Sequence, residues 1–310
     1  MTDDNPAIRA LPVAITPRLK RKVKLARAAA NLSYWMSARG VRDVRPGRVL
    51  CESIDRSVAR RMSYGDFVLT DAHGIPFFVR KGTFETGAYL HRPFEPATTR
   101  VFEQAVKPGA VVLDVGAQFG YFSLLAGKLA GPRGHVIAVE PVEDNLELLS
   151  WNVKFNSLED RIAIDGRGLS DRRETLSMFI YQESDSHALY RSPDAKVRDE
   201  VQVDLIPGDE LTGGKPVDVI KIDVEGHEQR VLSGLKETIA ASRGLVLIAE
   251  YAPAYLERGG TDPAEYLDNI RSLGFKVQVI YEETGLTGPF TDKVLEGLGP
   301  RPNVNLLCVK

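Results

Sequence analysis

The feature that most constrains the fold is the alternation of short apolar runs with amphipathic segments from Ala110 to the end of the chain. Short apolar runs separated by helical patterns predict parallel strands joined by helices that cover both faces of one sheet. The predicted strands are residues 110–116, 135–141, 161–170, 217–226, 245–251, 275–281 and 304–310, and the predicted helices are residues 119–131, 143–156, 228–242 and 262–274. The fold class is therefore α/β.

Two segments depart from this alternation of strands and helices. Residues 282–303 join the last two strands without a helix, so we expect the final strand to run antiparallel to the others. Residues 174–205 hold two strand-like runs in place of a helix. An insertion of this kind is expected at the rim where the strands end, which is where α/β folds bind ligands.

The N-terminal part divides into a leader, a basic arm and an entry hairpin. Residues 1–64 contain a loose leader over 1–16 and a helical, basic arm over 17–39, and residues 65–310 form the main domain. That domain opens with a β-hairpin entry at 65–84, turning at 71–74, and its core spans 85–310. The arm is either a solvated helix packed on the domain or, through residues 18–38, a peripheral contact to an anionic membrane surface.

Composition excludes several classes of protein. A formal net charge of −2 gives no reason to expect nucleic-acid binding. Two distant cysteines and five scattered histidines argue against a disulfide framework or a zinc site. No apolar run approaches the roughly 20 residues that span a bilayer, and no signal-peptide core is visible. These observations predict a cytoplasmic protein with no nucleic-acid partner.

The first chemical motif is the glycine turn after the first core strand, VLDVGAQFGYF. Such a turn brings the backbone close to a ligand and opens a helix whose N-terminus is partly positive. A dinucleotide fingerprint would place a glycine where Gln118 stands, and the carboxylate of Asp114 would repel a pyrophosphate but attract a sulfonium or an ammonium. Gly116, Gly120 and Asp114 therefore favour S-adenosylmethionine over a nicotinamide dinucleotide.

An acidic residue ends the next strand. Glu140, followed by Pro141, lies 20 residues after Gly120. A carboxylate at this place accepts hydrogen bonds from ribose hydroxyls, which suits either cofactor.

The second motif, DVIKIDVEGHEQRVLSG at 218–234, concentrates charge at the end of an apolar strand. Lys221 and Asp223 lie on one face of that strand, and a buried charge is costly unless it is paired, so we expect a salt bridge or a working site. Glu225, His227 and Glu228 follow, and one of the two glutamates is expected to serve the following helix through its dipole.

These stretches resemble the FkbM-type S-adenosylmethionine-dependent methyltransferases. The resemblance rests on residues 94–131, 134–156, 217–235, 245–251 and 272–277 and covers about 85–285, with the KIDVEGHE block its most specific part. It implies a class I, Rossmann-like fold with a seven-stranded sheet whose last strand is reversed. It also implies O-methylation of a hydroxyl on a sugar or a polyketide-like molecule. Gln118 departs from the asparagine usual in the family.

Carried over to this sequence, the resemblance implies two sets of residues. The cofactor-binding set is Glu95, Asp114, Gly116, Ala117, Gln118, Gly120, Tyr121, Glu140, Pro141, Asp165, Gly168, Leu169 and Asp223. The catalytic set, facing the methyl group and the acceptor, is Lys221, Asp223, Glu225 and His227.

The mechanism leaves alternatives open. Either Asp223 or His227 is the base that takes the acceptor's proton, with Lys221 setting the charge of Asp223. His187 lies in the insertion and is either an acceptor contact or an exposed loop residue. No metal is favoured, although Asp223 and Glu250 end neighbouring strands and a Mg²⁺ between them is the alternative.

Three functions compete at this point: an O-methyltransferase acting on a glycan or secondary metabolite, an NAD-dependent oxidoreductase, and a non-catalytic nucleotide-binding protein. The missing third glycine argues against the second, and the presence of Asp114, Glu140 and Asp223 argues against the third. The oligomeric state is left open.

Overall fold

The computed structural model describes residues 63–64, 66–82, 89, 94–182, 187–193, 195–291, 293–296 and 303–310, together with residues 25, 29, 32, 36, 39, 44, 46–50 and 53. The predicted leader and most of the predicted basic arm lie outside these residues. Within the described part of the chain, no helix has the length and apolar character needed to cross a membrane.

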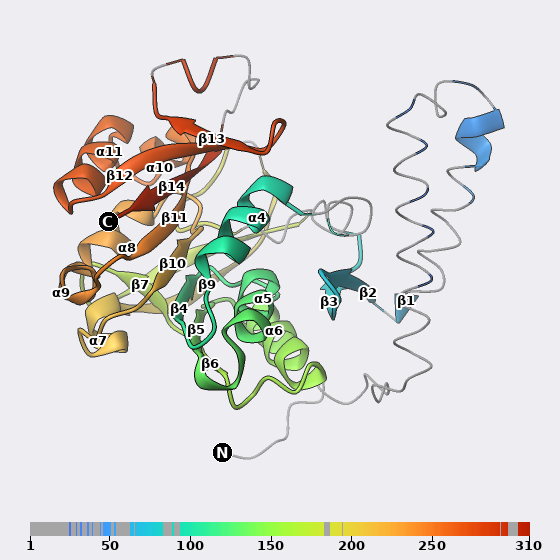
Figure 1. The fold of residues 1–310 in the computed structure, drawn as a ribbon, viewed down its shortest axis with the longest axis horizontal. Helices are drawn as coiled ribbons and strands as arrows, with labels where there is room; N and C mark the ends of the chain where they lie inside the picture. The colour runs from blue at the N-terminus through green and yellow to red at the C-terminus, as the bar shows by residue number, and fades with distance from the viewer. Residues whose placement is uncertain are drawn as a thin grey trace.

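A single eight-stranded sheet forms the centre of the molecule, in the order β13-β12-β14-β11-β10-β4-β5-β6 (Figure 1). The strands are β4 (Val111–Val115), β5 (His135–Val139), β6 (Ile162–Asp165), β10 (Val219–Ile222), β11 (Val246–Tyr251), β12 (Lys276–Tyr281), β13 (Leu286–Pro289) and β14 (Val304–Val309). The five strands from β6 to β11 pair in parallel, as the apolar runs predicted.

The predicted count of seven strands is wrong by one. Strand β14 runs antiparallel to β11 and to β12, as the helix-free connection indicated. That connection itself folds back on β12 as β13, with Gln278 opposite Pro289 and Tyr281 opposite Leu286. The short strand adds an eighth member at the edge of the sheet. Its sequence, LTGP, has no alternating apolar pattern, so β13 could not be recognised from periodicity.

Helices cover both faces of the sheet because successive strand residues point to opposite sides. In β4, Val112 packs into the core under the N-terminal helices, whereas Leu113 and Val115 pack into the opposite core. The first face carries α4 (Pro96–Ala105), α5 (Tyr121–Ala130) and α6 (Glu143–Phe155). The second carries α8 (Glu228–Ser233), α9 (Lys236–Ala241) and α11 (Pro263–Ser272).

Two predicted elements are each divided in the structure. The helix expected over 228–242 is broken into α8 and α9 at Gly234, where a Cβ would lie 1.9 Å from the Ser170 carbonyl oxygen. The strand expected over 161–170 ends at Asp165, and β7 (Gly168–Ser170) joins another sheet. In both places a close approach between distant segments overrides the local pattern.

The insertion forms a small sheet of its own, in the order β7-β9-β8. Its long strands are β8 (Glu174–Tyr181) and β9 (Val197–Pro207), which pair antiparallel, and β9 leads into α7 (Gly208–Thr212). Met178, Ile180, Val203 and Leu205 pack with Val142, the residue that precedes α6. The insertion is thereby fixed beside the carboxyl ends of β4 and β5, as expected for a rim insertion.

The predicted entry hairpin is present as β2 (Phe67–Ala72) and β3 (Ile75–Arg80), with β1 (Ser63–Tyr64) beside β2. His73 and Gly74 form its two-residue turn and both have positive φ, as the type I′ geometry requires. Asn152 of α6 binds the backbone N–H and carbonyl of Phe78 and the carbonyl of Phe119. One buried amide thus connects the hairpin, α6 and the glycine turn.

Candidate functional site

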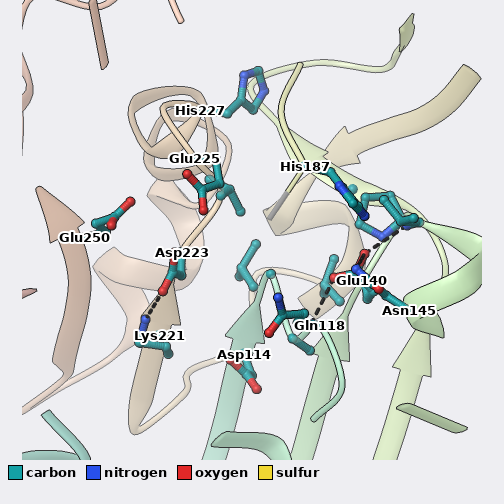
Figure 2. A pocket seen from close by; sticks show the side chains of 18 of the residues that line it. Asp114, Gln118, Glu140, Asn145, His187, Lys221, Asp223, Glu225, His227 and Glu250 are labelled. Carbon is teal, nitrogen blue, oxygen red and sulfur yellow. Dashed lines mark hydrogen bonds and ion pairs between the residues drawn. The ribbon is translucent and has the colours of Figure 1, made fainter. Parts of the chain in front are cut away.

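A cavity of about 420 Å³ lies at the carboxyl ends of β4, β5, β10 and β11, and the insertion forms one of its walls (Figure 2). All four predicted catalytic residues line it. So do most of the predicted cofactor-binding residues, namely Glu95, Asp114, Gly116, Ala117, Gln118, Tyr121, Glu140, Pro141, Gly168, Leu169 and Asp223. Gly120 and Asp165 do not.

The glycine turn is shaped by contacts with the protein as well as by its place in the cavity. Gly116 has φ +83°, and a Cβ on it would lie 1.9 Å from the carbonyl oxygen of Asp223. Gly120 begins α5, and a Cβ there would lie 2.6 Å from Leu149 Cδ1. Gly120 therefore allows α5 to pack on α6, and it is not among the residues that line the cavity.

Gln118 stands in the left-handed region with φ 50°. Asparagine is enriched in this conformation, so a local backbone reason accounts for the family's usual residue at this position. The backbone N–H of Gln118 donates to Glu140 Oε2 at 2.9 Å, and its side-chain oxygen accepts from the Tyr89 hydroxyl at 3.3 Å.

Glu140 is held at the end of β5 by the backbone around it. Besides the bond from Gln118, its Oε1 accepts the backbone N–H of Val142 at 3.0 Å and lies 3.5 Å from Asn145 Nδ2. Burial raises the pKa of Glu140 to about 7, against these hydrogen bonds, which lower it. The carboxylate is thus oriented and only partly stabilised in its charged form, which leaves it responsive to further hydrogen-bond donors.

Asp165, at the end of the neighbouring strand β6, forms an ion pair with Arg167. Its carboxylate accepts two bonds from the guanidinium of Arg167, at 2.9 and 2.7 Å, and one from the backbone N–H of the same residue. These bonds lower the pKa of Asp165. It therefore shapes the chain between β6 and β7, and it is not among the residues that line the cavity.

Lys221 and Asp223 form the expected salt bridge. Lys221 Nζ lies 2.8 Å from Asp223 Oδ2, and the lysine side chain is 1% exposed. Burial alone would lower the pKa of Lys221, but the carboxylates of Asp223 and Glu95 raise it above its usual value. The ammonium also lies 5.1 Å from the ring centroid of Phe122, a cation–π contact that further favours the charged form.

Asp114 faces the same side of the sheet, opposite Lys221 in the strand register. It is 2% exposed and accepts a short hydrogen bond from the Ser123 hydroxyl at the start of α5. Burial raises the pKa of Asp114 to about 6, while Ser123 and Lys221 lower it. Asp114 therefore remains largely charged at neutral pH beneath the glycine turn.

Two successive residues in the left-handed region set the directions of the side chains in the loop after β10. Glu225 has φ 53° and Gly226 has φ 98°, where a Cβ would lie 2.2 Å from the Tyr255 carbonyl oxygen. Glu228 Oε1 accepts the backbone N–H groups of Val224 and Gly226, both at 3.1 Å. Of the two glutamates, Glu228 is thus the one that stabilises the loop and helix, and Glu225 lines the cavity.

His227 also lines the cavity, but its ring is engaged with the insertion. Its Nε2 lies 3.3 Å from the Ser170 hydroxyl of β7. Burial lowers the pKa of His227 to about 4, helped by the nearby charge of Arg230. The imidazole is neutral at pH 7 and holds a proton weakly.

Two glutamates carry buried oxygen atoms without a partner among the described residues. They are Oε2 of Glu95, at the start of α4, and Oε2 of Glu250, at the end of β11. Glu250 Oε1 accepts from the Asn303 side chain at 3.0 Å. Burial and the carboxylates of Asp223 and Glu225 raise the pKa of Glu250 well above its usual value. Among the described residues, there is no group of three or more histidine, cysteine, aspartate or glutamate side chains that could hold a metal ion.

Several residues that line the cavity were not predicted from the sequence. Asn145 is 2% exposed, and its Oδ1 has no hydrogen-bond partner among the described residues although it lies beside Glu140. The insertion contributes Met178, Leu189 and Leu205. It also contributes His187, which had already been named from the sequence, and whose Nδ1 accepts from the Tyr181 backbone N–H at 3.4 Å. Of the residues missed, only Asn145 could have been found, since it follows Glu140 by five residues and lies in the first turn of α6.

Comparison with known protein families agrees with this arrangement. The family model described as the methyltransferase FkbM domain matches residues 114–277, which is more than half of the 310 residues. This chain belongs to the FkbM methyltransferase domain family. The match begins at Asp114 and includes Glu140 and the loop from Asp223 to Glu228, so the FkbM domain supplies most of the cavity's polar side chains.

Curated relatives share only part of their length with this FkbM-family chain. The AMB antimetabolite synthetase AmbE of Pseudomonas aeruginosa is 28% identical over 211 residues, covering 56% of this chain and 10% of that protein. A ribosomal protein L11 methyltransferase of Anoxybacillus flavithermus is 32% identical over 91 residues, covering 29% of this chain and 28% of that protein. The chain thus spans between a tenth and about a quarter of their length.

Solved structures with a similar fold include a transferase and a methyltransferase. A putative transferase of Pyrococcus horikoshii has a TM-score of 0.46 at 14% identity, with 84% of this chain and 81% of that chain covered. A SAM-dependent O-methyltransferase of Thermotoga maritima has a TM-score of 0.41 at 15% identity, with 79% and 77% covered.

Proposed function

We propose that this FkbM-family chain is an S-adenosylmethionine-dependent O-methyltransferase that methylates a hydroxyl of a glycan or secondary metabolite. The observation that carries the proposal is the position of Asp223. It lies at the end of β10, lines the cavity, and has one carboxylate oxygen fixed by the buried Lys221. A carboxylate that is held in place and reaches the cavity suits proton removal from an acceptor hydroxyl.

The residues on the β4 and β5 side suit the cofactor. Backbone N–H groups orient the Glu140 carboxylate, which suits it to accept hydrogen bonds from a ribose diol, and the partnerless Oδ1 of the buried Asn145 beside it offers an acceptor for a further hydrogen bond. Asp114 gives this side negative charge, which favours a sulfonium and an ammonium. When bound, S-adenosylmethionine supplies an activated methyl group, and its transfer to the acceptor oxygen breaks the sulfur–carbon bond and leaves the electron pair on sulfur.

The chain's own residues then align the reactants and accept the proton. Asp223 takes the proton of the acceptor hydroxyl as the oxygen forms its bond to the methyl carbon. Lys221 keeps the Asp223 carboxylate in one orientation. Alignment of two reactants contributes about 7–11 kcal/mol to such a reaction, and a positioned base about 10²–10⁴-fold. We assign the base to Asp223 in preference to His227, whose Nε2 faces Ser170 and whose pKa is lowered to about 4 by burial.

Calorimetric titration with S-adenosylmethionine and, separately, with NAD tests the cofactor assignment. We expect binding of S-adenosylmethionine alone, and a loss of affinity of about tenfold or more in Glu140→Ala, because the carboxylate that would accept hydrogen bonds from the ribose is then missing. Binding of NAD, or of neither molecule, would overturn the proposed function. A screen of sugar and polyol acceptors for S-adenosylhomocysteine release then tests the O-methylation.

A further inference from the structure

Four aromatic side chains form one wall of the cavity, and we refer to them as the aromatic wall. They are Tyr89, Phe94, Tyr121 and Phe122, all of which line the cavity and are buried or half-buried. The ring centroids of Tyr89 and Phe94 lie 4.5 Å apart, and those of Phe94 and Tyr121 lie 5.2 Å apart. The centroid of Tyr121 lies 5.0 Å from that of Phe122. The four rings thus form one continuous apolar surface.

The aromatic wall extends from the glycine turn to the proposed base. At one end, the Tyr89 hydroxyl donates to Gln118 Oε1 at 3.3 Å. At the other end, the Phe122 ring lies beside the lysine ammonium that is bound to Asp223. Figure 2 shows Gln118 between Glu140 and Asp223. In the proposed function the ribose binds at Glu140 and the methyl group is transferred beside Asp223, so the sulfonium lies alongside this wall.

The wall offers π-electrons to a ligand, because its hydroxyl groups are bound within the protein. The Tyr89 hydroxyl is bound to Gln118, and the Tyr121 hydroxyl lies 3.0 Å from Thr99 Oγ1. The face of an aromatic ring carries negative potential and attracts a cation within about 6 Å of its centroid. The wall already holds one cation in this way, since the Lys221 ammonium lies 5.1 Å from the centroid of Phe122.

The sulfonium is the charged group of the cofactor that such a wall suits. It has no N–H or O–H, so its positive charge cannot be recognised by donating a hydrogen bond. Aromatic rings bind cations of this kind, as they bind quaternary ammonium groups, most strongly where water is excluded. Methyl transfer converts the sulfonium into a neutral thioether, which loses this attraction. A wall of rings therefore distinguishes the methyl donor from the product by charge.

We infer that Tyr89 and Phe94 bind the sulfonium of S-adenosylmethionine through cation–π contacts, so that the cavity prefers the charged donor to the neutral S-adenosylhomocysteine. The inference rests on the proposed function, whose cofactor it concerns. Tyr89 and Phe94 are specificity-determining residues in this arrangement, and Asp223 remains the base. The preference favours replacement of the spent cofactor by a fresh one after each methyl transfer.

Calorimetric titration with three ligands separates the effect of charge from that of shape. S-Adenosylmethionine carries the sulfonium, S-adenosylhomocysteine the neutral thioether, and sinefungin a protonated amine in place of the sulfonium methyl. In Phe94→Leu we expect the affinities for the two charged ligands to fall about three- to tenfold, while that for S-adenosylhomocysteine changes less than about twofold. Tyr89→Leu is expected to do the same. Tyr89→Phe, which keeps the ring and loses the hydroxyl, is expected to keep the wild-type preference.

A fluorinated ring tests the same contact without removing an apolar side chain. Phe94→pentafluorophenylalanine keeps the ring but withdraws electrons from its face, so the preference for the charged ligands is expected to be lost. This variant decides the question if Phe94→Leu fails to fold. Phe155→Leu is the matched control, because Phe155 is a half-buried ring of α6 that contacts Phe78 and lies outside the cavity lining. It is expected to keep the preference.

Equal losses for the three ligands in Phe94→Leu would overturn the inference, because the ring would then supply apolar contact alone. A preference that survives in the fluorinated variant would overturn it as well. Failure of the proposed function looks different. If both S-adenosylmethionine and S-adenosylhomocysteine bind and Glu140→Ala weakens both, the cofactor assignment stands whatever the Phe94 variants do. If neither binds to the wild type, the proposed function fails and this inference fails with it.

Discussion

The backbones of Gly116 and Asp223 are in close contact, because the absence of a side chain on Gly116 leaves room for the Asp223 carbonyl group. A Cβ at Gly116 would lie 1.9 Å from that oxygen, and Asp223 N–H donates to the carbonyl of Val115, the preceding residue. The turn that was expected to admit a cofactor therefore also fixes the backbone of the proposed base. The two motifs of the sequence, joined through Gly116 and Asp223, which are 107 residues apart, form one structural unit.

Substitution of Gly116 by alanine should destabilise the protein through this contact. The residue has φ +83°, which costs an alanine about 1 kcal/mol, and the clash with backbone atoms adds about 1–3 kcal/mol. Gly109→Ala is the control, because Gly109 has φ +87° but a Cβ there would meet nothing within 4 Å. Urea unfolding should show the larger loss for Gly116→Ala. Equal losses would mean that the contact is relieved by a small shift.

Asp223→Asn should separate catalysis from cofactor binding. The amide keeps the size of the side chain but cannot accept the acceptor's proton, so turnover should fall by about 10²–10⁴-fold. The affinity for S-adenosylmethionine should change by less than about threefold, since the ribose contact at Glu140 is untouched. His227→Gln should reduce turnover far less. The reverse ranking of the two variants would transfer the role of base to His227.

Glu228 should make the unliganded protein less stable as the pH rises. Burial raises the pKa of Glu228 from 4.5 to about 7, so the folded chain binds this proton between about pH 4.5 and 7 while the unfolded chain releases it. The free energy of unfolding therefore falls through this window, by up to about 3 kcal/mol. Glu228→Gln keeps an oxygen that accepts from Val224 and Gly226 but does not ionise.

The Glu228→Gln variant should therefore show a flatter dependence of unfolding free energy on pH and a stability at pH 8 at least equal to the wild type. Glu159→Gln, at an exposed glutamate, should leave the dependence unchanged. Glu228→Ala, which removes the oxygen, should lose about 1–3 kcal/mol at every pH because two backbone N–H groups lose their partner. An unchanged pH dependence in Glu228→Gln would contradict the raised pKa.

Asn152→Ala should cost about 2–4 kcal/mol of stability. The side chain is fully buried and makes three hydrogen bonds to the backbone of Phe78 and Phe119, which its loss leaves unpaired. Asn269→Ala is the control, since Asn269 is also a helical asparagine but makes one bond, to Gln229. Thermal unfolding should show the smaller loss for Asn269→Ala, and similar losses would show that the hairpin is not held through Asn152.

The sequence by itself determined the α/β class, the parallel strands, the reversed last strand and the position of the two charged motifs. These follow from the apolar period and from glycine and proline, which act within a few residues. Lys221 and Asp223 show why a site can be partly predicted in this way. A lysine inside an apolar strand requires a partner, and the partner two residues away on the same face could be read directly.

Only the tertiary structure decided the features that depend on contacts between distant segments. Strand β13 exists because it pairs with β12, and the break between α8 and α9 exists because Gly234 meets Ser170. Asp165 pairs with Arg167, and Gly120 lets α5 approach Leu149 closely; neither residue is among those that line the cavity. The partnerless oxygen of Glu250 is a property of its surroundings as well. Burial and the charges around a group set its chemistry, and they arise only when the chain has folded.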